Sequence, residues 1–190
     1  MNPAPTLRTD RLRLRGWRDS DKPAYAALNA DPEVMAHFPS TLTAEQSDEM
    51  VDRMAAAWGE RGYGLWAVDR HDTGEFIGFV GLSSPSWQAE CTPCVEVGWR
   101  LARKHWGRGF APEAAQAALE WGFADLELPR DEIVSFTTVA NHNSRRVMEK
   151  LGLLHDPSRD FDHPLLPDWA GCRHVLYAID RRQWQAGMAR

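Results

Sequence analysis

One segment, Val95–Phe123, constrains the fold of this chain more than any other. It opens with residues that alternate as in a β-strand, which we expect to cover Cys94–Leu101. Pro112 is then placed as the first residue of a helix that runs to Leu126. A tight Gly107-Arg108-Gly109 turn separates the two elements. A strand that leads through glycines into a helix predicts a mixed α/β fold.

The glycine turn also predicts a binding site for an anion. Glycines let consecutive backbone N–H groups point at one place, and the helix start adds about half a positive charge. Four cations and no acid lie between Val97 and Pro112, namely Arg100, Arg103, Lys104 and Arg108. A pyrophosphate is the natural ligand of such a cradle. The segment is neither a P-loop, which needs Gly-Lys-Ser/Thr, nor a dinucleotide fingerprint, because Pro112 replaces the third glycine. A simple tight turn remains the alternative.

Strand and helix signals alternate along the rest of the chain. Further strands are expected at a half-exposed Arg11–Arg15 and at Leu65–Asp69, Phe76–Leu82, Ile133–Val139 and Arg173–Asp180. Helices are expected after Asp19-Ser20, from the capping box Thr43-Ala44-Glu45-Gln46 to about Arg61, and at Asn141–Leu151. No repeat or linker interrupts this order, so we expect one mixed α/β domain over residues 1–190.

Composition excludes several classes of protein. Hydrophobic residues make up 43% of the 190 residues and charged residues 26%, which are ordinary globular values. No stretch approaches the roughly 18 apolar residues of a membrane span, and the N-terminus has no signal-like apolar run. We therefore expect a cytoplasmic protein with no membrane partner. The net charge of −5 disfavours a nucleic-acid partner.

Three cysteines do not make a disulfide framework. Cys91 and Cys94 form a C-x-x-C, but no second pair of ligands completes a structural zinc site, so no metal is expected. The residues that follow Cys94 alternate like a strand, whereas a redox C-x-x-C usually opens a helix. We interpret the pair as part of a loop.

A second polar unit follows the first. A strand ends near Thr138, and Asn141, Asn143 and Ser144 begin a short helix that Gly152 closes. Together the two units resemble the GNAT superfamily of acyl-CoA-dependent N-acetyltransferases, whose pyrophosphate loop reads Gln/Arg-x-x-Gly-x-Gly/Ala. Lys104 stands here in the place of the Gln/Arg. The RimJ/RimL-like branch is resembled most, through Thr9–Arg15, Asp31-Pro32-Glu33-Val34, Trp106–Ala114 and Asn141–Gly152.

The resemblance, which runs from about Leu7 to Trp184, implies a fold and a cofactor. The fold is a mixed sheet in which two central parallel strands, Cys94–Leu101 and Ile133–Val139, splay apart between flanking helices. The cofactor is acetyl-CoA, whose pantetheine arm would enter between these strands. The implied cofactor-binding residues are Trp99, Leu101, Lys104, Trp106, Gly107, Arg108, Gly109, Phe110, Ala111, Asn141 and Ser144.

Glu96 and Ser144 are the candidate catalytic residues. Glu96 lies on the expected central strand between two valines, where burial would raise its pKa and suit it to act as a base. A salt-bridged glutamate of the sheet face is the alternative. Ser144 is carried over from the RimL-like pattern as a proton donor, and a helix cap is its alternative role.

The sequence gives less information on the acceptor pocket than on the cofactor site. Residues that would line it are Glu33, His37, Phe38, Trp66, Trp87, Asp162 and His163. The expected activity is acetyl transfer to a primary amine of a peptide N-terminus, a small amine or an amino acid. An acyl-CoA-binding or regulatory protein without catalysis, and a nucleic-acid module using Arg100–Arg108, are the competing hypotheses. A homodimer stays open.

Overall fold

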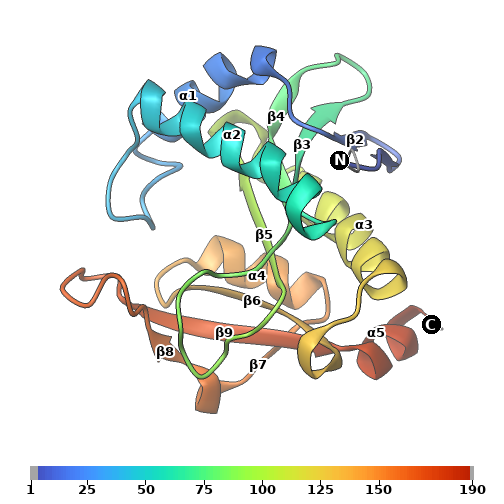
Figure 1. Ribbon diagram of the computed structural model, residues 1–190, viewed down its shortest axis with the longest axis vertical. Helices are drawn as coiled ribbons and strands as arrows, with labels where there is room; N and C mark the ends of the chain where they lie inside the picture. The colour runs from blue at the N-terminus through green and yellow to red at the C-terminus, as the bar shows by residue number, and fades with distance from the viewer. Residues whose placement is uncertain (1–3, 189–190) are drawn as a thin grey trace.

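The computed structural model describes residues 4–188, and in that part of the chain nine strands form one sheet (Figure 1). The strand order is β1-β2-β3-β4-β5-β6-β9-β7, and β8 pairs with β9. The strands are β1 (Leu7–Arg8), β2 (Leu12–Arg15), β3 (Leu65–Arg70), β4 (Phe76–Ser83), β5 (Glu96–Leu101), β6 (Glu132–Thr138), β7 (Leu154–His155), β8 (Phe161–Asp162) and β9 (Arg173–Asp180). The helices are α1 (Lys22–Ala30), α2 (Ala44–Arg61), α3 (Phe110–Asp125), α4 (His142–Lys150) and α5 (Arg181–Met188).

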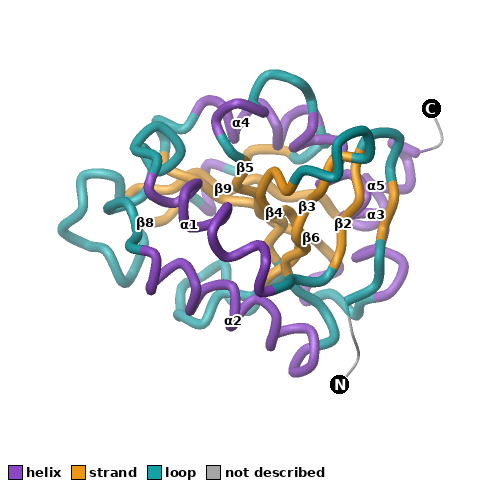
Figure 2. Tube along the Cα trace, turned by 90° about the horizontal axis from the view of Figure 1, so that it is seen from above, coloured by secondary structure: helices purple, strands orange, loops and turns teal. Residues whose placement is uncertain are grey.

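The helices cover both faces of the sheet. Figure 2 shows the strands as a middle layer, with α1 and α2 on one side and α4 on the other. The α1–α2 face packs on a core that contains Tyr25, Val51 and Phe79. The opposite face of β4 and β5 packs on the small residues of α3, including Ala115 and Ala118. No helix in the described residues is long and apolar enough to cross a membrane.

The capping box predicted before α2 is present. The Thr43 side chain accepts a hydrogen bond from the Gln46 backbone N–H at 3.2 Å, and the Gln46 side chain accepts one from the Thr43 N–H at 2.9 Å. These two bonds satisfy amides that the first turn of a helix leaves unpaired. The helix begins at Ala44 and ends at Arg61, where Gly62 takes a left-handed conformation, as the sequence indicates.

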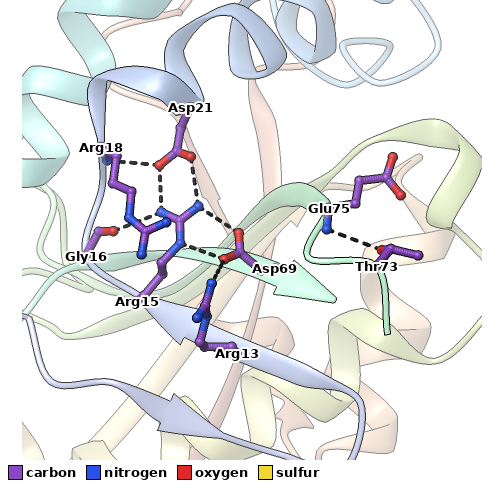
Figure 3. A network of polar contacts seen from close by, with 8 residues as sticks. All are labelled: Arg13, Arg15, Gly16, Arg18, Asp21, Asp69, Thr73 and Glu75. Atoms are coloured by element: carbon purple, nitrogen blue, oxygen red, sulfur yellow. Dashed lines mark hydrogen bonds and ion pairs between the residues drawn. The ribbon is translucent and has the colours of Figure 1, made fainter. Parts of the chain in front are cut away.

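The strand expected to be half-exposed does have Arg11 exposed and Arg13 half-buried, but Arg15 is buried with Leu12 and Leu14. Arg15 is only 6% exposed because its guanidinium binds the carboxylates of Asp21 and Asp69 at 2.7–2.8 Å (Figure 3). Arg13 also donates to Asp69, at 2.6 Å. Burial raises the pKa of Asp69, but the hydrogen bonds from Arg15 and Arg13 outweigh it and hold that pKa below its ordinary value. Alternation alone cannot reveal these partners, since they come from other segments.

The central strands separate as the resemblance implies. β5 and β6 are the one parallel pair of neighbours in the described sheet, and a single pair of residues, Glu96 and Val134, lies in register. The Val134 N–H donates to the Val95 carbonyl oxygen at 2.9 Å just before this point. Beyond Glu96 the two strands no longer pair. The sheet therefore forks at Glu96, between its β1–β5 and β6–β9 parts (Figure 1).

Other boundaries differ from the expectations. β5 begins at Glu96 rather than Cys94. α3 begins at Phe110 rather than Pro112, because Gly109 already serves as its N-cap with a left-handed φ of +79°. The short strands β1, β7 and β8 and the C-terminal helix α5 are absent from the expectations, since each is too short to show a period in sequence.

Candidate functional site

A cavity of about 640 Å³ opens at the fork between β5 and β6. It extends from Glu96 to the turn before α3 and to the start of α4. Most of the site residues expected from sequence line it: Glu33, His37, Phe38, Glu96, Trp99, Leu101, Trp106, Gly107, Gly109, Phe110, Ala111, Asn141, Ser144 and His163. The expected residues that lie outside its lining are Lys104, Arg108, Trp66, Trp87 and Asp162.

The turn before α3 has the backbone conformation of an anion cradle. Gly107 and Gly109 have φ values of +71° and +79°, which residues with a side chain rarely adopt. The amides of Phe110 and Ala111 begin α3, where helix N–H groups have no partner within the helix. Trp106 fixes the other side of the turn, because its Nε1 donates to the Leu101 carbonyl oxygen at 2.7 Å. These residues fit a pyrophosphate, as acetyl-CoA requires.

The four cations of this segment do not all face the cradle. Arg103 donates to the Glu33 carboxylate at 2.7 Å, and Lys104 pairs with Glu75. Arg108 is exposed on the turn itself, and Arg100 lies on β5 before the turn begins. Arg103 and Lys104 thus hold neighbouring segments, and the anion cradle stays a prediction for which the turn offers mainly backbone amides.

The N-terminal segment braces the start of α3. Thr9 Oγ1 donates to the Glu113 carboxylate at 2.5 Å, and the Arg11 backbone N–H donates to the same oxygen at 2.9 Å. The Arg11 guanidinium binds Glu113 Oε2 at 2.6 Å, the Arg108 carbonyl oxygen at 2.9 Å, and lies 4.7 Å from the centre of the Phe110 ring. Residues of the Thr9–Arg15 motif thus hold the glycine turn from outside.

Glu96 lies at the fork itself. Its Oε2 accepts a hydrogen bond from Ser83 Oγ at 3.4 Å, and its Oε1 is 3.8 Å from the position a Cβ would occupy on Gly98. Burial raises the pKa of Glu96 to about 8, and the Ser83 hydrogen bond lowers it only in part. No cation forms an ion pair with Glu96 in the described residues, so the salt-bridged alternative has no partner there.

Ser144 lies at the start of α4, on the cavity wall. The helix cap is Asn141, whose Oδ1 accepts from the Ser144 backbone N–H at 3.1 Å. Asn141 Nδ2 donates to Thr137 Oγ1 at 2.9 Å, which ties the cap to β6. Capping is therefore the role of Asn141, and the Ser144 hydroxyl is not needed for it.

The acceptor side of the cavity is built from loops. The segment between α1 and α2 supplies Glu33, His37 and Phe38, and the segment between β8 and β9 supplies His163 and Trp169. Burial lowers the pKa of both His37 and His163. These two histidines are thereby biased towards their neutral form.

His174 is a cavity residue that sequence reasoning misses. It is 8% exposed on β9, lines the cavity, and burial lowers its pKa. Its Nδ1 lies 2.8 Å from the Cys172 carbonyl oxygen, so that nitrogen carries the proton and Nε2 is free to accept. A histidine within an alternating strand has no sequence feature that tells whether its side chain faces the core or a cavity.

Three residues expected in the acceptor pocket lie elsewhere. Trp66 is fully buried and packs against Trp58 and Trp121, with ring centres 4.6 and 5.3 Å away. Trp87 does not line the cavity but packs against His163, which does, with ring centres 5.1 Å apart. Asp162 is exposed and pairs with Arg173 at 3.5 Å. Tryptophans are large apolar groups, and packing explains the positions of both.

The cysteine pair lies in the loop before β5. Cys91 and Cys94 are free thiols, each 3% exposed, and pack against Val134 and Leu176. A hydrogen bond with Cys94 lowers the pKa of Cys91 to about 7. No cluster of three or more potential metal ligands occurs in the described part of the chain. The role of this C-x-x-C as a plain loop stays a prediction.

Comparisons with known proteins agree with this geometry. Residues 11–154 match the family model described as an acetyltransferase (GNAT) domain. The uncharacterised protein YkkB of Bacillus subtilis is 34% identical over 87% of this chain and 95% of its own length. The FsC-acetyl coenzyme A-N(2)-transacetylase of Aspergillus fumigatus is 30% identical over 95% of this chain and 78% of its own. A crystal structure of an acetyltransferase from Agrobacterium tumefaciens is 30% identical, with a TM-score of 0.74 over 95% of this chain and 97% of that one.

Proposed function

Because the chain belongs to the GNAT family of acetyl-CoA-dependent N-acetyltransferases, we propose that it acetylates a primary amine by direct attack in a ternary complex. The acceptor is the α-amine of a peptide, a small amine or an amino acid. One observation carries the proposal: a single cavity joins the glycine turn before α3 to Glu96 at the fork. Because the turn and Glu96 line the same cavity, the acetyl group and the amine can meet there directly, and the proposed reaction needs no covalent acetyl-enzyme.

Glu96 serves in this proposal as the base. Acetyl-CoA supplies the activated acetyl group, and the acceptor must lose a proton to attack it. At pH 7 this deprotonation costs about 1 kcal/mol for an α-amine of pKa near 7.8 and about 4.6 kcal/mol for a lysine of pKa near 10.4. The pKa of Glu96, about 8, is closer to the pKa of the amine than the pKa of an ordinary glutamate is. A base whose pKa is near that of the amine accepts its proton more readily.

Ser144 serves as the proton donor to the departing thiolate. Ser144 lines the cavity, and its backbone N–H rather than its side chain is engaged in the cap of α4. A free thiol has a pKa of about 8.5, so proton donation helps departure at pH 7 without being essential. We therefore assign Ser144 a smaller share of the rate than Glu96.

We place the chain in the RimJ/RimL-like branch of the family. The support is the Thr9–Arg15 motif, because Thr9 and Arg11 bind the Glu113 carboxylate at the start of α3. The motif and the cofactor loop thus act as one structural unit.

The name of the Aspergillus fumigatus relative bears on the reaction rather than on the branch, since it states a transfer from acetyl coenzyme A to a nitrogen.

The test is a screen of acceptor amines by release of free thiol from acetyl-CoA. Amino acids, small amines and short peptides are supplied in turn, and the product is identified by mass. Thiol release that depends on an amine and yields its N-acetyl derivative is expected. Binding of acetyl-CoA without turnover across the screen would favour the alternative, a regulatory acyl-CoA-binding protein. Micromolar binding of random duplex DNA at physiological salt would favour the nucleic-acid hypothesis.

A further inference from the structure

Arg100 is a cation on the cavity wall without a carboxylate partner. In the described residues its side chain makes one hydrogen bond, from Nη1 to Asn29 Oδ1 at 2.7 Å. Its Nε is buried and has no hydrogen-bond partner. The guanidinium lies 4.1 Å from the centre of the Phe38 ring and 5.6 Å from that of Phe79. A guanidinium has five N–H donors, so most of its capacity is unused.

The surroundings hold Arg100 in this position. Asn29 is fully buried, and its Nδ2 donates to Ser47 Oγ at 3.1 Å, which in turn donates to the Thr43 carbonyl oxygen at 2.9 Å. This chain of hydrogen bonds turns the Asn29 oxygen towards Arg100. Burial lowers the pKa of Arg100, since its charge has lost water and gained little in return. A fixed, poorly compensated cation is suited to receive an anion.

This cation belongs to the acceptor side rather than to the cofactor cradle. Arg100 pairs in register with Phe79, which packs on the α1–α2 face of the sheet. Its neighbour Leu101 belongs to the core on the α3 side. Since side chains alternate along a strand, Arg100 shares its face with Glu96 and Gly98. The base and the cation thus face the same space, with a glycine between them.

We infer that the acceptor amine carries a carboxylate, which binds Arg100 while the amine lies at Glu96. This inference rests on the proposed function and names its substrate class. One monoanion balances one guanidinium, whereas a phosphate would bring a second negative charge into a cavity that Glu33 and Glu96 also line. Arg100 lies four positions after Glu96 along the strand, so their Cα atoms are about 13 Å apart. The amine and the carboxylate are therefore separated by several bonds, as in an ω-amino acid.

The first experiment compares 6-aminohexanoate with 6-aminohexanamide, which differ only in the anion. The carboxylate is expected to have a kcat/KM about 30-fold higher, the effect of one or two charge-assisted hydrogen bonds. Glycine, whose two groups share one carbon, is expected to be a poor acceptor. Equal use of acid and amide, or a preference for glycine or for an aminoalkyl phosphonate, would overturn the inference.

The second experiment removes the cation. Arg100→Gln is expected to raise the KM for 6-aminohexanoate about 30-fold, leave the amide unchanged and keep acetyl-CoA affinity. Arg100→Lys keeps the charge and is expected to retain part of the preference. Arg53→Gln, an exposed charge on α2, is the matched control and should change neither acceptor. An equal loss for acid and amide in both Arg100 variants would show a structural role only.

Calorimetry separates this inference from the proposed function. Binding of 6-aminohexanoate to the protein in the presence of CoA needs no turnover. Arg100-dependent binding without any acetylation would retain the anion site and overturn the proposed reaction. Acetylation of amines with no dependence on Arg100 would retain the reaction and overturn the anion site.

Discussion

The two ends of the cavity are made in different ways. The proposed cofactor end is a contiguous turn, Gly107 to Ala111, which offers backbone amides and left-handed glycines. The acceptor end is assembled from side chains of β5, the α1–α2 segment and the β8–β9 segment. A backbone cradle recognises one constant group, whereas side chains from separate segments can change independently. This difference explains why the sequence indicates the cofactor more clearly than the acceptor.

The largest effect is expected at the cofactor end, from Gly109→Val. A β-branched residue at a φ of +79° is strained and obstructs the approach of a phosphate to the turn. For wild type, acetyl-CoA at 100 times its Kd adds about 2.7 kcal/mol, a Tm shift of roughly 5–10 °C. The variant should lose this shift in a thermal melt.

Gly62→Val is the matched control for that change. Gly62 has a φ of +76° at the end of α2, and no atom lies within 4 Å of the position that a Cβ would occupy there. The strain is similar, so stability should fall while the acetyl-CoA shift persists. Retention of the shift in Gly109→Val would mean that the turn is not the cradle.

At the acceptor end, Glu96→Gln should lower the rate by roughly 10²–10⁴ at neutral pH and leave cofactor affinity intact. With a lysine-type acceptor, whose own pKa of about 10.4 lies well above that of Glu96, wild-type kcat/KM should rise through an inflection near pH 8. The variant should lack that inflection. An unaltered rate at pH 7 would make Glu96 structural.

Stability offers an independent readout of the same residue. The folded-state pKa of Glu96, about 8, exceeds its ordinary value of 4.5, so the folded protein retains a proton that the unfolded chain releases. The free energy of unfolding should therefore decrease as pH rises from 4.5 to 8, and part of this slope should vanish in Glu96→Gln. Denaturant titrations across that range measure it.

A smaller effect is expected from Glu113→Gln, which weakens the brace on the cofactor turn. The glutamine amide has no negative charge for Arg11, and its NH2 group replaces one of the two oxygens that accept from Thr9 and Arg11, so acetyl-CoA affinity should fall about 10-fold. Glu120→Gln, an exposed position on the same helix, should bind normally. Calorimetry measures the acetyl-CoA affinity of both variants. Equal affinities would show that the contacts of Glu113 with Thr9 and Arg11 do not contribute to cofactor binding.

The smallest effect is expected from Ser144→Ala, a rate loss of about 10-fold or less, because the thiol is already a fair leaving group at pH 7. Its stability should match wild type, since the cap of α4 uses only the Ser144 backbone N–H. Asn141→Ala should instead lower the free energy of unfolding by about 1 kcal/mol. A stability loss in Ser144→Ala would return that residue to a structural role.

The features that depend on neighbours in sequence could be predicted, whereas those that depend on contacts between distant segments could not. The glycine turn, the α2 capping box and the strand bearing Glu96 depend on neighbours in sequence, and the structure has each of them. The pocket position expected for Trp66 is wrong because β3 is buried on both faces, so alternation does not tell core from pocket. From sequence, Arg100 is grouped with the cations of the glycine turn because it lies close to them in the chain. It lies an even number of residues from Glu96 on the same strand, however, so both side chains are on the acceptor face of the sheet.

The brace between Thr9, Arg11 and Glu113 has a consequence for how the chain assembles. Its two sides are 104 residues apart for the Thr9–Glu113 bond, so a nascent chain has made its first strand long before the helix that needs it emerges. Loop closure over such a distance is entropically costly and slows folding. The cofactor turn should therefore be among the last parts to become rigid, and a ligand that binds it would slow unfolding rather than speed folding.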